Sequence, residues 1–164
     1  MKKGHLSILS VVIVASFLVW YLHPTQQLKR KSSAILEDFT LTEDTGLVSK
    51  AIFSSKQYSP MVEVDFGANS DLKKHIPQLP VSHTIHQEKL VMASQSLHKV
   101  AEILSHEPSE FTVKKTEPKT YTVSFKDSIR LKLKNKPINT TINTNVVFTF
   151  EKSKQGFQLS KVKF

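Results

Sequence analysis

Residues 121–164, YTVSFKDSIRLKLKNKPINTTINTNVVFTFEKSKQGFQLSKVKF, decide the fold class of this chain. In the first part of this stretch the apolar side chains keep odd numbers: Tyr121, Val123, Phe125, Ile129, Leu131 and Leu133. In the second part they keep even numbers: Ile142, Val146, Phe148 and Phe150. Successive side chains of a strand point to opposite faces, so each set marks the buried face of a strand. The stretch predicts a sheet of three or four long antiparallel strands.

Two irregularities interrupt this alternation. Asp127 breaks the odd-numbered set, so we expect either one long bent strand or a hairpin that turns at Lys126–Ser128, with Asp127 in a turn or bulge. Near the end of the chain the apolar positions slip from odd, at Leu159, to even, at Val162. A one-residue slip would turn half of the apolar side chains toward water, so a β-bulge is expected between these two residues.

The residues before this sheet predict helices and two further strands. Apolar residues at spacings of three and four indicate helices with one buried face, and a proline in the first turn favours a helix start at Pro24. The expected elements are a helix from Thr25 to Phe39, a short helix over Leu47–Phe53, a strand over Met61–Phe66, a long helix over His86–Ser105 that Pro108 ends, and a strand over Phe111–Lys114.

This order of elements, together with the closing phrase Val146-Val147-Phe148-Thr149-Phe150, a polar turn and Gly156-Phe157-Gln158-Leu159, resembles the nuclear transport factor 2-like (cystatin-like) superfamily. The resemblance covers residues 24–164 and implies a single α+β domain, a cone in which a long helix packs on a curved antiparallel sheet. It implies one of three roles: an isomerase or dehydratase with an Asp or Tyr in a pocket inside the cone, a non-enzymatic scaffold, or a periplasmic domain held by a single anchor in bacterial secretion machinery.

The amino-terminal run Leu6–Leu22 contains seventeen residues and no charge. A helix of this length spans about 25 Å, close to the thickness of a bilayer core. Trp20 and Tyr21 stand where aromatic rings favour the headgroup layer, and no small-residue cleavage pattern follows. We therefore predict that residues 1–23 form a single-pass signal-anchor in the cell membrane, with the domain outside the cytoplasm. A cleaved signal peptide and a buried core helix are the alternatives.

The composition excludes several classes of site. The chain has no cysteine, which rules out disulfides and thiolate chemistry, and its four glycines are too scattered for a phosphate-binding loop. The net charge of +9 is concentrated in the last third of the chain. Residues 1–110 carry eleven basic and eleven acidic side chains, whereas residues 111–164 carry twelve basic and three acidic ones. One surface of the protein is therefore expected to be basic.

The best candidate for that surface is the even-numbered face of the strand around residue 130. It carries Lys126, Arg130, Lys132, Lys134 and Lys136, which would lie in a row about 6.6 Å apart. Such a row fits an anionic surface or an acidic protein partner. Alternatively, it is a solvated face whose lysines discourage aggregation. The aromatic residues of this strand have the opposite parity, which argues against nucleic acid as the partner.

Candidate pocket residues are Asp65, Tyr121 and Asp127, since a carboxyl group beside an apolar face can act as a base. The histidines predict no metal site. His83 and His86 are expected in a loop or at a helix start, and His98–Glu102–His106 reads as a solvent-facing ladder on the long helix. We expect no cofactor.

Taken together, these patterns favour a membrane-anchored, non-enzymatic binding or scaffold domain, such as a component of a bacterial envelope or secretion complex. Its basic sheet face is expected to meet a protein partner or an anionic surface. The alternative is a small-molecule-binding or enzymatic pocket inside the cone, of the isomerase or dehydratase kind. An open cavity would favour the alternative, and a core filled by leucine and phenylalanine would favour the scaffold.

Overall fold

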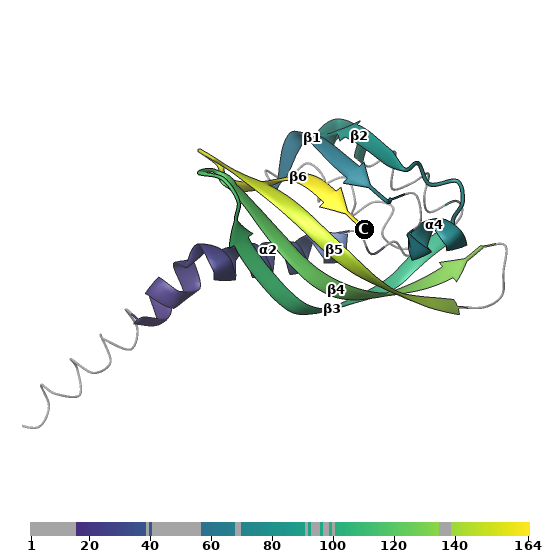
Figure 1. Cartoon of the computed structure of the whole chain (residues 1–164), viewed down its shortest axis with the longest axis horizontal. Helices are drawn as coiled ribbons and strands as arrows, with labels where there is room; N and C mark the ends of the chain where they lie inside the picture. The colour runs from purple at the N-terminus through teal and green to yellow at the C-terminus, as the bar shows by residue number, and fades with distance from the viewer. Residues whose placement is uncertain are drawn as a thin grey trace, which may run out of the picture.

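A curved six-stranded sheet forms the body of the molecule, and one helix packs against its inner face (Figure 1). The computed structural model describes residues 16–38, 40, 57–67, 70–90, 92, 96, 99, 101–134 and 139–164. Its named elements are α2 (Pro24–Asp38), β1 (Tyr58–Asp65), α4 (Asp71–His75), β2 (Ser82–His86), the 3-10 helix η2 (Gln87–Lys89), β3 (Ala101–Lys115), β4 (Thr120–Leu133), β5 (Asn139–Ser153) and β6 (Gly156–Lys163).

The strands lie in the order β2-β1-β6-β5-β4-β3. All neighbours pair antiparallel except β1 and β6, which are parallel. The sheet is therefore mixed, and the expectation of a purely antiparallel sheet was wrong. The parallel pair arises because β1 comes from the amino-terminal half of the chain and adds to the far edge of the β3–β6 meander. The α+β class itself is confirmed.

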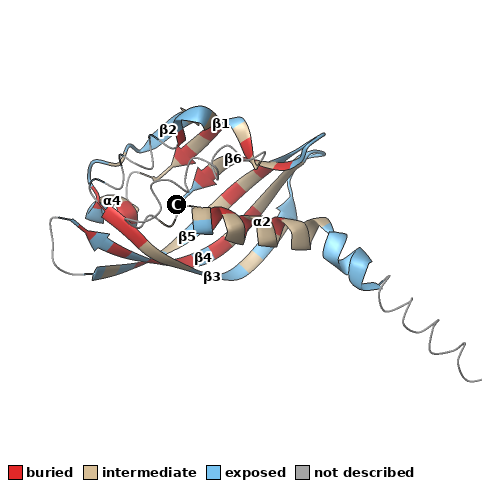
Figure 2. Cartoon of the chain, turned by 180° about the vertical axis from the view of Figure 1, so that it is seen from behind, coloured by how far each residue is buried: buried red, intermediate tan, exposed pale blue. Residues whose placement is uncertain are grey.

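β4 and β5 follow their sequence pattern. Val123, Phe125, Ile129 and Leu131 are buried in β4, and Ile142 to Phe150 alternate in β5 as expected (Figure 2). β4 is one continuous strand, so the hairpin at Lys126–Ser128 was wrong. Asp127 stands in the middle of this strand, not in a turn, and is 1% exposed. A carboxyl group on the buried face of a strand requires a polar partner.

The expected bulge near the carboxyl end is confirmed. Leu159 pairs with Phe150 and Lys161 pairs with Thr149, so Ser160 is the extra residue. Its hydroxyl donates a hydrogen bond to the Thr149 carbonyl at 3.2 Å. The bulge returns Val162 to the buried face, where it joins the core.

α2 begins at Pro24, as the sequence predicts, and supplies the inner layer of the core. Leu28, Ile35 and Leu36 are buried in one core cluster with residues of β1, β4, β5 and β6, and α2 packs across β3 and β4. Burying a leucine or isoleucine side chain contributes about 2 kcal/mol, and this contact fixes the helix across the sheet.

The prediction of one long helix over His86–Ser105 was wrong at both ends, because both ends lie in strands. His86 belongs to β2, and β3 already begins at Ala101, while Leu90, Met92 and Ser96 between them are helical. Ala101 and Ile103 pair with Leu133 and Leu131 of β4. The pattern around them fits a helix and a strand equally well, and pairing with β4 decides for the strand. Pro108 therefore does not end a helix; it lies within β3, which extends well beyond the strand expected at Phe111–Lys114.

Two of the predicted helices cannot be compared in full with the structure. The short helix over Leu47–Phe53 and the first ten residues of the run Leu6–Leu22 lie outside the described residues. Ser16–Leu22 is helical and its large side chains are exposed. Within the described ranges, no helix combines the length and the apolar character needed to cross a bilayer.

Candidate ligand cavity

The inner face of the sheet is not completely filled, and a cavity of about 390 Å³ remains inside the cone. This volume lies within the usual range for small-molecule sites. Every named element from α2 to β6 except the 3-10 helix η2 contributes to its wall. The apolar wall includes Leu36, Val64, Phe66, Leu72, Ile76, Leu79, Ile85, Leu90, Ile103, Ile129, Leu131, Phe148, Val162 and Phe164.

Four polar side chains interrupt this wall: Gln78, His83, Ser96 and His106. His83 is exposed and Ser96 is exposed, so these two lie where the cavity meets solvent. His106 is different, because its side chain is only 6% exposed. It is therefore the polar group that a molecule inside the cavity would meet away from water.

His106 forms a buried pair with Asp127. The distance from His106 Nδ1 to Asp127 Oδ2 is 2.7 Å, and the Asp127 side chain is 0% exposed. A hydrogen bond of this length between a ring nitrogen and a carboxyl oxygen is strong, because the surrounding low dielectric weakens it little. Asp127 does not belong to the cavity wall; it stands behind His106 and holds the ring.

The register of β3 and β4 explains how the pair meets. His106 lies opposite Ile129, and Asp127 lies opposite Pro108, so the two residues are diagonal neighbours on one face of the sheet. A β-bulge between Ile103 and Ser105 shifts the register just before His106. This shift places the histidine on the inner side, next to the carboxyl group.

Each partner retains one polar atom for which the described residues offer no hydrogen bond. These atoms are His106 Nε2 and Asp127 Oδ1, and both are buried. Buried polar atoms without partners are rare in folded proteins and are often found at functional sites. Asp127 occupies the other ring nitrogen, so His106 Nε2 is the ring atom that has no partner among the described residues.

Of the three residues predicted for a pocket, Asp127 alone supports this cavity, and it does so through His106. Asp65 is half-buried at the end of β1, where its Oδ1 accepts a hydrogen bond from Gly67 N at 2.9 Å. Tyr121 packs edge-to-face on Phe157, with ring centroids 5.1 Å apart. Neither Asp65 nor Tyr121 is part of the cavity wall.

The sequence analysis missed His106. It placed Glu102 and His106 on a solvent-facing helix ladder, but both lie in β3 and both side chains are largely buried. His83 lies in β2, where a loop or a helix start was expected, whereas His86 ends β2 and is also the N-cap of η2. The one signal for His106 was Asp127 itself, because a carboxyl group on an apolar strand face implies a buried polar partner. Among the described residues no group of acidic and histidine side chains could hold a metal ion.

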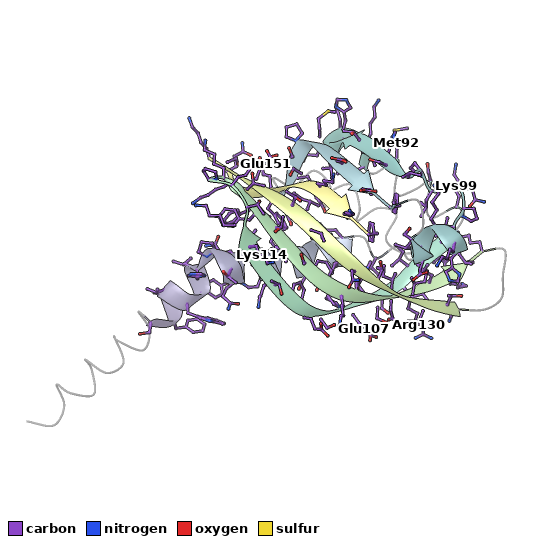
Figure 3. The ribbon with its side chains drawn as sticks, viewed as in Figure 1. Met92, Lys99, Glu107, Lys114, Arg130 and Glu151 are labelled. Atoms are coloured by element: carbon purple, nitrogen blue, oxygen red, sulfur yellow. The ribbon has the colours of Figure 1, made fainter. Side chains whose placement is uncertain are left out.

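The basic row of β4 lies on the outer side of the sheet, as predicted for Lys126, Arg130, Lys132 and Lys134, while Lys136 lies outside the described residues. Several of these basic side chains form ion pairs with carboxylates of β3. Lys126 pairs with Glu110 at 2.8 Å, and Glu102 receives Lys132 at 3.1 Å and Lys134 at 3.8 Å. Arg130 projects from the sheet in the neighbourhood of Glu107 (Figure 3). That this basic row forms a partner-binding surface stays a prediction.

No family model matches this chain, and no curated protein matches it significantly. Solved structures do. A nuclear transport factor 2-like protein from Cytophaga hutchinsonii has a TM-score of 0.58 at 8% identity, over 87% of this chain and 97% of that one. A ketosteroid isomerase-like protein from Erwinia carotovora atroseptica has a TM-score of 0.58 at 15% identity, over 82% and 89%. A hexachlorocyclohexane dehydrochlorinase from Novosphingobium barchaimii has a TM-score of 0.59 at 7% identity, over 83% and 81%.

The chain has the nuclear transport factor 2-like fold. The resemblance seen in the sequence is thereby confirmed at the level of the fold. At these identities the neighbours say nothing about which activity this chain has, because one fold hosts many functions.

Proposed function

We propose that this chain binds a small, largely apolar molecule inside the cone and holds one polar group of it against His106. The observation that carries the proposal is the buried His106–Asp127 pair at the wall of an otherwise apolar cavity. This is the alternative that the sequence left open, and it is now favoured over a scaffold with a filled core.

The apolar wall supplies the affinity in this proposal. Removing apolar surface from water contributes about 25 cal/mol for each Å², so a ligand that touches several leucine, isoleucine and phenylalanine side chains gains a few kcal/mol. A site of this kind binds poorly to ions and strongly hydrated molecules, since its wall is mostly apolar and offers few groups to replace their water.

His106 supplies the selectivity and a possible chemistry. When Nδ1–H of the neutral ring donates a hydrogen bond to Asp127, the lone pair lies on Nε2, which can accept a hydrogen bond from the ligand. A histidine oriented by a buried carboxylate is also a suitable general base. Isomerisation and dehydrochlorination both begin with removal of a proton, and two structural neighbours carry names of that kind. We therefore extend the proposal to proton abstraction from the bound molecule.

The test compares two probes of similar shape, naphthalene and 1-naphthol, by titration calorimetry on the full-length protein in nanodiscs, with empty nanodiscs as the blank. The hydroxyl group of 1-naphthol can donate to His106 Nε2, so we expect it to bind about fivefold more tightly than naphthalene. In the double variant His106→Leu/Asp127→Leu both probes should bind, and this preference should disappear.

A second pair of variants tests the location. Leu131→Phe narrows the cavity and should weaken the binding of both probes, because the larger ring takes up part of the volume that a ligand would occupy. Arg130→Phe changes the neighbouring residue on the outer side of the same strand and should leave binding unchanged. Equal binding to the two variants, or an unchanged preference in the double variant, would overturn the proposal.

We also propose that the amino-terminal run tethers this domain to the cell membrane, with the domain outside the cytoplasm. The observation in favour is a row of exposed large side chains at Phe17–Leu22, between 44% and 71% exposed. Six consecutive exposed apolar residues are unusual on a protein surface facing water and are typical of a surface that faces lipid or a partner.

A further inference from the structure

Five lysines that have no carboxylate partner among the described residues gather at one end of the cone. We call this group, Lys114, Lys115, Lys119, Lys152 and Lys154, the basic end. The first three lie at or beside the turn between β3 and β4, and the other two lie at or beside the turn between β5 and β6. All five side chains are exposed, and none forms an ion pair with any residue in the described ranges.

Hydrogen bonds join the two turns to each other. The backbone N–H of Lys152 donates to the Lys119 carbonyl at 2.7 Å, and Thr120 pairs with Glu151 in the sheet. Lys152 and Lys115 each lie 5.9 Å from an aromatic ring centroid, of Phe157 and Tyr121 respectively. Because those two rings contact each other, the lysines of the two turns share one surface.

α2 begins at the same end. The Lys31 ammonium donates to the Phe157 carbonyl, next to the β5–β6 turn, and Figure 1 shows both hairpin turns on the side of the sheet where α2 starts. Lys29 and Arg30 add to the positive charge. Against these cations the two turns carry only Glu117 and Glu151. This surface is far less neutralised than the row on β4, whose lysines meet Glu102 and Glu110.

The exposed aromatic segment is fixed to this end as well. Phe17 contacts Trp20 and Tyr21, with ring centroids 5.8 Å and 5.9 Å apart. The Arg30 guanidinium lies 3.5 Å from the centre of the Tyr21 ring and also donates to the Tyr21 carbonyl. Gln27 Nε2 donates to the Leu22 carbonyl at 2.6 Å. These bonds tie the apolar segment to the first two turns of α2.

We propose that the basic end docks on an anionic lipid surface. The inference rests on the tether proposed above, and the docking can fail while the tether stands. Exposed aromatic residues that partition to a headgroup layer lie beside lysines that such a layer attracts when it contains anionic lipids. The docked domain would stand on the membrane by its hairpin turns, with one orientation, instead of moving freely about its anchor.

Electrostatics of this kind is short-ranged and sensitive to salt. Each lysine that reaches an anionic membrane strengthens the contact by about fivefold, and the attraction decays over about 10 Å at moderate ionic strength. Docking should therefore protect the amino groups of the basic end from reagents in water, in anionic membranes and at low salt only.

The experiment places the full-length protein in vesicles of phosphatidylcholine alone or of phosphatidylcholine mixed with phosphatidylglycerol. Flotation measures membrane attachment, and mass spectrometry measures how fast each lysine is acetylated by a reagent that cannot cross the bilayer. We expect Lys115 and Lys152 to react at least about threefold more slowly in the anionic vesicles, with the difference lost in high salt. Lys126, on the outer face of β4, is the internal control and should react equally in both.

Two variants with the same change of charge locate the effect. Lys119→Glu/Lys154→Glu reverses two lysines of the basic end and should abolish the protection of Lys115 and Lys152. Lys89→Glu/Arg130→Glu reverses two exposed cations elsewhere and should preserve it. Equal reactivity in the two vesicle types, or equal loss in both variants, would overturn the docking proposal while leaving the tether in place. Failure to float with either vesicle would overturn the tether and the docking together.

Discussion

At the scale of single residues, the stability of the fold depends on the pairing of the buried residues His106 and Asp127. Asp127 occupies a position of β4 where every second neighbour is apolar, and its side chain has no contact with water. A buried carboxyl group without a partner is strongly destabilising, and the hydrogen bond from His106 offsets that cost.

This dependence predicts an unusual result of mutagenesis. His106→Leu should lower the free energy of unfolding by about 3 kcal/mol, because it leaves Asp127 buried without its partner. His106→Leu/Asp127→Leu should lie within about 1 kcal/mol of the parent, since both polar groups are replaced by apolar side chains. Urea unfolding of the full-length variants measures both. A double variant as unstable as the single one would show that the two residues are not coupled.

Tyr58 and Asp38 form a second pair, remote from the cavity, that joins β1 to the end of α2. The Tyr58 hydroxyl donates to Asp38 Oδ2 at 2.9 Å, and Tyr58 is 1% exposed. Burial is the main cause that raises the pKa of the Tyr58 phenol far above its usual value, and the nearby Asp38 carboxylate raises it further. Burial also raises the pKa of Asp38, although the hydrogen bond from Tyr58 opposes this shift.

The Tyr58 shift makes stability fall in alkaline solution. The unfolded chain releases the phenol proton near pH 10, whereas the folded protein retains it, so the stabilisation is complete below about pH 10 and declines above it. The free energy of unfolding of Tyr58→Phe should therefore decrease less than that of the parent between neutral and strongly alkaline pH. At neutral pH the variant should be less stable than the parent, because it lacks one hydrogen bond. Tyr121→Phe is the matched control and should keep the slope of the parent. A parental slope in Tyr58→Phe would contradict the assignment.

At the scale of elements, the sequence predicted what depends on local alternation. β4, β5, the bulge at Ser160 and the start of α2 at Pro24 all follow from apolar residues within a dozen positions of one another. The same reasoning assigned the first residues of β3 to a helix, which was wrong. Ala101–Leu104 satisfies helical and strand periodicity alike, and its pairing with β4 depends on residues about thirty positions later.

The candidate site was half predictable for the same reason. Asp127 was visible because it interrupts an alternation, but His106 meets it only through the register of two strands with a bulge just before the histidine. The spacing of residues along the sequence does not reveal how two strands are aligned, so it could not predict this contact. The second bulge of β3, between Ser109 and Thr112, and Pro108 lie on an edge strand, where both features hinder pairing with other chains.

At the scale of the whole molecule, the proposed features occupy separate parts of one cone. The cavity lies between the inner face of the sheet and the helices α2 and α4, whereas the basic end consists of hairpin turns beside the start of α2. A ligand site and a membrane contact can therefore act at the same time. Such an arrangement would suit a protein that takes up apolar molecules close to a bilayer, where they are concentrated.

The tether gives the prediction that concerns the molecule as a whole. Leu18→Asp/Val19→Asp places two charges in the apolar run, each of which costs about 3 kcal/mol within a bilayer. We expect this variant to be extracted from membranes by alkaline carbonate and to lose flotation with phosphatidylcholine vesicles, while the parent does neither. Val81→Asp/Met92→Asp introduces the same charges at two exposed apolar residues elsewhere and should float like the parent. If both variants float, the run is not what holds the protein on the membrane, and the orientation of the cone must have another cause.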